Sequence, residues 1–113
     1  MDRRVVVEID LKALVRNYRR IAAHVKPAKV LCVLKANAYG LGVAPFARAL
    51  GAAGCRSFGV AEPYEALEIS AALRRAGVRD AEVQILSSVL PDEVVEMVRG
   101  GVTLPVTGLE GAK

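Results

Sequence analysis

The sequence lacks the cysteine clusters, long apolar runs and concentrated charge that mark several large classes of protein. Its two cysteines, Cys32 and Cys55, are far apart, and neither belongs to a CxxC pair or another spacing typical of metal ligands. We therefore expect neither a disulfide framework nor a bound metal. Two isolated thiols fit a reducing compartment, so we expect a cytoplasmic protein.

No segment approaches the length of apolar chain that crosses a membrane. The first residues, MDRRVVVEID, include only three consecutive apolar residues before charged residues return, which is too few for a secretory signal. The formal net charge is +4, but most basic residues are dispersed among acidic ones. Arg16, Arg19 and Arg20 do lie close together, on the polar side of a predicted helix, where a solvated face is the usual outcome. We expect neither a membrane nor a nucleic-acid partner.

What the sequence does contain is a regular alternation of apolar strands and amphipathic helices. Residues 5–9 predict a short strand, Asp10 is a good helix N-cap, and apolar residues at helical spacing continue as far as Val25. Four further strands and three further helices follow. The predicted strands are 30–34, 57–61, 83–88 and 102–106, and the predicted helices are about 44–53, from Pro63 to the stop at Gly77, and 91–99.

This alternation predicts an α/β fold with parallel strands covered by helices. Strand starts near residues 30, 57, 83 and 101 give units only slightly shorter than those of a (β/α)8 barrel, and an open doubly wound sheet is the alternative. Thr107 and Glu110 have the spacing of a capping box, which predicts another helix. Because four strands are half a TIM-type barrel, we expect residues 1–113 to be the N-terminal half of a longer barrel domain.

One lysine stands where an apolar strand meets a loop that contains glycine. The run VLCVL (30–34) suits a strand buried on both faces, and Lys35 follows it. Ligands of parallel α/β folds bind at this end of the strands. Partial desolvation there would favour the neutral amine, which attacks carbonyl groups, and Gly40 and Gly42 allow close backbone approach. A lysine that simply extends into solvent is the alternative.

The stretch VLKANAYGLG (33–42) resembles the pyridoxal-phosphate attachment motif of the alanine racemases, V-V-K-A-N-A-Y-G-H-G. One departure from that motif is Leu41, where many members have histidine. VEIDLKALVRNYRRI is similar to the opening strand and helix of the family, and FGVAEPYEALEISAALRRAGV to its second βα unit. The resemblance covers nearly the whole chain.

The resemblance implies a cofactor and a reaction. Lys35 would hold pyridoxal 5′-phosphate as an aldimine and act as one of two bases at the α-carbon, and Tyr39 would hydrogen-bond the cofactor phosphate. The implied activity interconverts L- and D-alanine and supplies D-alanine for peptidoglycan, in a homodimer of the full-length protein. In the family, the second base is a tyrosine of the partner subunit's C-terminal β-domain, which these 113 residues do not contain. We therefore expect this chain to be inactive by itself.

Three other functions remain open at the level of sequence. A non-catalytic pyridoxal-phosphate protein on a single barrel also carries a lysine at a strand end, but without the A-Y-G-x-G continuation. A decarboxylase on the same barrel would share the lysine and not this loop. A small α/β interaction module would bind no cofactor at all. The sequence also does not distinguish alanine from serine as the substrate.

Overall fold

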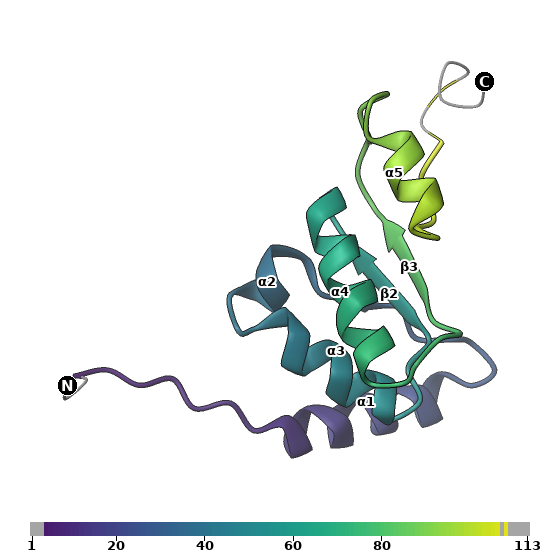
Figure 1. Ribbon diagram of the computed structural model, residues 1–113. Coiled ribbons are helices and arrows are strands. Elements are labelled where there is room, and N and C mark those ends of the chain that lie inside the picture. Colours follow the sequence, from purple (N-terminus) through teal and green to yellow (C-terminus); the bar gives the residue numbers. More distant parts are fainter. Residues whose placement is uncertain (1–3, 107, 109–113) are drawn as a thin grey trace.

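The computed structural model describes residues 4–106 and Gly108, and it contains three short parallel strands with helices packed against one face (Figure 1). The strands are β1 (Cys32–Val33), β2 (Ser57–Val60) and β3 (Glu82–Ile85). The helices are α1 (Leu11–Val25), α2 (Lys35–Tyr39), α3 (Val43–Ala52), α4 (Pro63–Arg75) and α5 (Val94–Arg99). The predicted α/β fold with parallel strands alternating with helices is confirmed.

The sheet has the order β1-β2-β3, so strands adjacent in sequence are also adjacent in space. Alternate residues of β2 and β3 point to one face and are buried there, with Phe58, Val60, Val83 and Ile85 each at most 4% exposed. Helices α3 and α4 pack against each other, and α4 also contacts β2 and β3. The opposite face carries Gln84, which is half-buried. The described sheet is therefore covered on one face only.

The expectation of a β1 buried on both faces is consequently wrong. Only Cys32 and Val33 pair as strand residues, both are half-buried, and Leu31 is 37% exposed. Leu34 is the best buried residue of the run, and its N–H donates to the carbonyl of Gly59 at 2.9 Å. An apolar run predicts burial, but which faces are covered depends on neighbours that the run does not specify.

The first helix begins where the sequence predicted. Asp10 is the N-cap, and its Oδ1 accepts a hydrogen bond from the N–H of Ala13 at 3.1 Å. The apolar side of α1 lies against α3, but it is only partly covered, and Ile21 remains 53% exposed. The amphipathic pattern therefore predicted the helix and its orientation better than its degree of burial.

Two predicted strands are wrong. Residues 5–9 are extended but pair with no strand in the described part of the chain, and Val5 is 81% exposed. Residues 102–106 make only a single bridge, between Thr103 and Gln84. The next hydrogen bond of that parallel ladder would need an N–H at Pro105, which has none. The helix predicted from the spacing of Thr107 and Glu110 lies outside the described residues.

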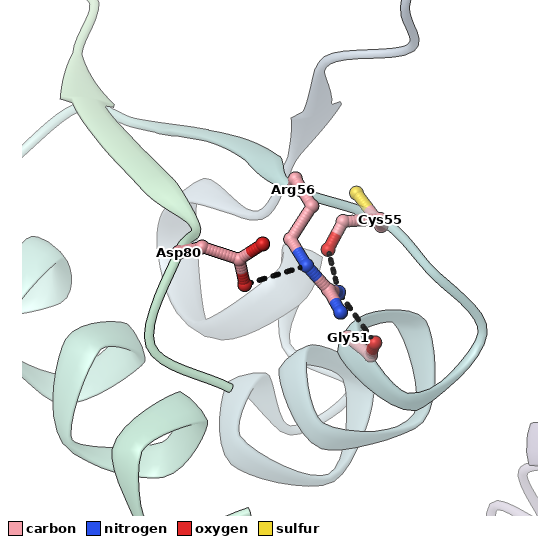
Figure 2. A network of polar contacts seen from close by, with 4 residues as sticks. All are labelled: Gly51, Cys55, Arg56 and Asp80. Atoms are coloured by element: carbon pink, nitrogen blue, oxygen red, sulfur yellow. Dashed lines mark hydrogen bonds and ion pairs between the residues drawn. The ribbon is translucent and has the colours of Figure 1, made fainter. Parts of the chain in front are cut away.

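A cluster of polar contacts closes the amino end of the sheet (Figure 2). One terminal nitrogen of Arg56, Nη1, donates to the carbonyls of Gly51 at 2.8 Å and Cys55 at 3.0 Å, and its Nε lies 2.9 Å from a carboxylate oxygen of Asp80. The guanidinium thus joins the last turn of α3, the start of β2 and the loop before β3. These contacts lie at the end of the sheet opposite Lys35.

Candidate active site

Lys35 lies at the carboxyl end of β1, where the sequence predicted it. The residue before it is anchored on β2 through the Leu34–Gly59 hydrogen bond. The Lys35 side chain is exposed, so the expected desolvation by the apolar strand is wrong. The cause is the uncovered face of the sheet, which leaves solvent beside the strand end. The amine is therefore accessible to a ligand.

The segment labelled α2 is a turn whose backbone is left-handed after Lys35, and the sequence did not predict it. Ala36, Asn37 and Ala38 have φ of 53–56° and ψ of 47–50°, and Tyr39 has φ of 58°. For residues with a Cβ atom, this conformation costs about 1–2 kcal/mol each, and asparagine tolerates it best. Such a turn persists only when the surrounding structure holds it in place.

Several hydrogen bonds hold the turn. The N–H of Ala38 donates to the carbonyl of Leu34 at 3.0 Å, and the N–H of Gly42 donates to the carbonyl of Asn37 at 2.9 Å. The side-chain oxygen of Asn37 accepts from the N–H of Val43 at 2.9 Å, at the first residue of α3. Ala38 is 1% exposed, so its methyl group also packs in the core. Asn37 therefore shapes the turn and needs no chemical role.

Glu65, in the first turn of α4, is the one buried charged side chain among the described residues, at 4% exposure. Its Oε1 accepts from the N–H groups of Ala61 at 3.2 Å and Glu62 at 2.8 Å. Its Oε2 accepts a hydrogen bond from the N–H of Ala36, the residue directly after Lys35. The carboxylate thus connects the start of α4 to the left-handed turn.

The sequence did not predict this connection. The spacing of Glu62 and Glu65 is a signal for the bond back to the helix start, because a residue three positions into a helix reaches the N-cap amide. Nothing local signals the bond to Ala36, since that contact joins residues 29 positions apart.

Tyr39 lies at the other end of the turn and is 61% exposed. It lines an apolar groove of about 290 Å³ together with residues of α1, β1 and α3, among them Leu14, Val33 and Phe46. Lys35 is not among the residues that line this groove. The structure therefore brings Lys35 and Tyr39 onto one short turn, both open to solvent, with the groove beside Tyr39 only.

The two cysteines, 23 positions apart in sequence, lie together beside the sheet. Both are free thiols, and their sulfur atoms are 3.4 Å apart. The Sγ of Cys55 also lies 3.3 Å from the carbonyl oxygen of Ser57. The hydrogen bond with Cys32 lowers the pKa of Cys55 to about 7, against the opposing effect of burial. The pKa of Cys32 is raised, first by its hydrogen bond with Cys55 and then by burial.

Within residues 4–106, no group of three or more histidine, cysteine, aspartate or glutamate side chains is arranged to hold a metal ion. No helix in the same part of the chain is long and apolar enough to cross a membrane.

Comparison with known proteins gives one consistent family. Residues 9–113 match the model of the alanine racemase N-terminal domain. Alanine racemase 3 of Salmonella typhi is 48% identical over 86 residues, which are 76% of this chain and 22% of that protein. The catabolic alanine racemase of Rhizobium johnstonii is 39% identical over 94 residues, which are 83% of this chain and 24% of that protein.

Solved structures agree. Alanine racemase from Bartonella henselae, with covalently bound pyridoxal phosphate, has a TM-score of 0.78 and 38% identity over 85% of this chain and 27% of its own. The enzyme from E. faecalis has a TM-score of 0.78 and 31% identity over 92% of this chain and 27% of its own. This chain thus spans about a quarter of the length of these relatives. It belongs to the alanine racemase family, and its parallel strands and helices match part of that family's barrel domain.

Proposed function

We propose that residues 1–113 are the N-terminal portion of a pyridoxal-phosphate-dependent alanine racemase that interconverts L- and D-alanine. The observation that carries the proposal is the placement of Lys35, an exposed amine at the carboxyl end of a parallel strand. This is the end at which barrel enzymes bind their ligands. The covalently bound pyridoxal phosphate of the Bartonella relative supports the choice of cofactor.

The residues of this chain fit a bound pyridoxal phosphate. A lysine that attaches a cofactor covalently needs an accessible amine, and the one ion pair among the described residues joins Arg56 and Asp80, not Lys35. The exposed hydroxyl of Tyr39, at the end of the same turn, is available to donate a hydrogen bond to a phosphate. When bound, the cofactor supplies an electron sink for the substrate α-carbon. Lys35 would hold it and move a proton on one face of that carbon.

Racemisation needs proton removal on one face and delivery on the other, so it requires a second base. We assign that base to a part of the longer protein outside these residues, contributed within a homodimer. We further propose that the longer protein is cytoplasmic, takes alanine as its amino-acid substrate and supplies D-alanine for peptidoglycan. The lengths of the relatives support a longer protein, because this chain corresponds to only 22–27% of them.

Covalent labelling tests the role of Lys35. The chain is incubated with pyridoxal phosphate, reduced with borohydride, digested and mapped by mass spectrometry. We expect the label on Lys35 in preference to Lys12, Lys26 and Lys29. Lys35→Arg should abolish the dominant label, and the matched variant Lys29→Arg should leave it unchanged. Equal labelling of all lysines would contradict the proposal, and the absence of any stable label would favour a cofactor-free interaction module.

A further inference from the structure

We propose that Glu65 is a positioning residue for Lys35, acting through the backbone that follows the lysine. This inference rests on the proposed function, because it concerns how the cofactor-binding amine is held. Glu65 does not touch the amine. Its carboxylate fixes the peptide group between Lys35 and Ala36, by accepting the N–H of Ala36.

The two carboxylate oxygens of Glu65 have different partners. Oε1 accepts from Ala61 and Glu62, at the end of β2 and the start of α4, as a helix cap would. Oε2 accepts from Ala36, in the turn that follows β1. Capping α4 requires only the first set of bonds. The second bond contributes nothing to the helix, and its effect falls on the turn that begins at Lys35.

Lys35 is anchored on both sides. Before it, Leu34 is buried and bonded to Gly59 of β2; after it, Ala36 is bonded to Glu65 of α4. The hydroxyl of Ser87, just beyond β3, donates to the carbonyl of Ala61. Polar contacts therefore run across the carboxyl ends of all three strands, and Glu65 is the link that reaches Lys35.

The left-handed turn makes this link important. Ala36 is an exposed alanine in a conformation that alanine avoids, and its own side chain offers nothing to stabilise it. Without the acceptor on Glu65, the peptide between Lys35 and Ala36 could rotate toward ordinary right-handed or extended geometry. The amine would then sample many directions, and fewer of them would suit a bound cofactor.

Amide hydrogen exchange on the unchanged chain provides the first test. Ala36 is exposed, so its N–H should exchange fast unless Glu65 protects it. We expect it to be protected to a similar degree as the N–H of Ala38, whose residue is buried. A freely exchanging Ala36 amide beside a protected Ala38 amide would overturn the inference without any substitution.

The second test compares Glu65→Gln with Glu68→Gln, which alters an exposed glutamate of the same helix. A glutamine side chain has one oxygen and cannot serve both sets of amides. We expect Glu65→Gln to speed exchange at Ala36 and to slow borohydride-trapped labelling of Lys35 by about tenfold each, with the label spreading to other lysines. Glu68→Gln should match the unchanged chain in both.

Circular dichroism shows whether each variant folds, and Glu65→Asp, which keeps the charge but is one methylene shorter, serves as a second variant. Faster exchange at Ala36 with unchanged selectivity for Lys35 would reduce Glu65 to a structural residue and overturn the inference. If the unchanged chain does not label Lys35 selectively, the proposed function fails instead. The exchange measurement still reports whether Glu65 holds Ala36.

Discussion

At the scale of single residues, Tyr39 offers an exposed hydroxyl whose removal changes little else. The side chain is 61% exposed, so Tyr39→Phe should leave the fold intact. A hydrogen bond to a phosphate is charge-assisted and contributes about 1.5–3 kcal/mol. We expect the variant to bind pyridoxal phosphate about tenfold more weakly or worse, as measured by titration of cofactor absorbance. Tyr64→Phe, at a 66% exposed tyrosine, is the control. Unchanged affinity would remove Tyr39 from the cofactor site.

The thiol pair makes stability depend on pH in a defined direction. The pKa of Cys55 falls from 9.0 to about 7 on folding, so its thiolate stabilises the fold increasingly as pH rises from about 7 to 9. That contribution is fully present above about 9 and is lost as pH falls through about 7. The raised pKa of Cys32 acts in the opposite sense, and it lowers stability as pH rises above 9.

We therefore expect the ultraviolet absorbance of a thiolate to appear near pH 7 in the unchanged chain. Cys32→Ala removes the hydrogen bond between the two sulfur atoms and leaves burial, so the absorbance should appear at clearly higher pH. Cys32→Ser keeps a hydroxyl that can make this hydrogen bond and should resemble the unchanged chain. If the pH midpoint of the thiolate absorbance is the same in all three proteins, Cys32 does not control the pKa of Cys55.

The candidate site residues that the sequence predicts lie within one continuous motif. Lys35 and Tyr39 lie four positions apart, and the strand before them fixes which end of the sheet they occupy. Their roles with the cofactor stay predictions. The bond between Glu65 and Ala36 was not predicted, because it depends on how α4 lies beside the turn that follows β1. The closeness of Cys32 and Cys55 likewise arises from the sheet and from no local pattern.

At the scale of elements, the left-handed turn predicts an unusual response to glycine. Ala36→Gly relieves about 1–2 kcal/mol of backbone strain, while the extra freedom of glycine in the unfolded chain costs about 0.5–1 kcal/mol. We expect a net stabilisation of about 0.5–1 kcal/mol. The control, Ala23→Gly, lies in right-handed α1 and is also exposed; it should destabilise by about 1 kcal/mol. Denaturant midpoints measure both, and similar destabilisation by the two variants would contradict a left-handed Ala36.

The Arg56 cluster predicts that lysine cannot replace arginine there (Figure 2). Arg56→Lys keeps the charge but cannot reach the two carbonyls and Asp80 together with one ammonium group. We expect a loss of about 1–2 kcal/mol in the free energy of unfolding, from hydrogen bonds to a charged donor. Asp80→Asn should cost less than about 0.5 kcal/mol, because Asp80 is 79% exposed and exposed ion pairs contribute little. Equal effects of the two variants would assign the stability to the ion pair.

Elements with a regular apolar pattern were the predictable ones. Helices α1, α3 and α4 and strand β2 appear within a few residues of their predicted bounds, because each has an apolar pattern of the right period. Segments whose structure depends on a neighbour were mispredicted. Residues 5–9 have the composition of a strand but no partner among the described residues, and 102–106 lose a ladder bond at Pro105.

At the scale of the whole molecule, the chain provides a place for one base and leaves one face of its sheet uncovered. We expect the 113-residue chain with added pyridoxal phosphate to interconvert L- and D-alanine at least about a hundredfold more slowly than the longer protein, because a missing general acid or base typically costs that much or more. Chiral chromatography of the alanine product measures the rates. The longer protein with Lys35→Ala gives the baseline. Turnover by the chain within about tenfold of the longer protein would show that the second base lies within these residues.

Glu65 and Arg56, at the two ends of β2, carry opposite charges. The direction of the chain decides which charge suits which end. Every helix that follows a parallel strand starts at the carboxyl end of the sheet and finishes at the amino end. Unpaired N–H groups therefore collect at one end and unpaired carbonyls at the other. Glu65 accepts from amides at the first end, and Arg56 donates to carbonyls at the second. Exchanging the two charges would place each side chain against backbone dipoles of its own sign. A double charge reversal at Glu65 and Arg56 therefore cannot preserve these contacts.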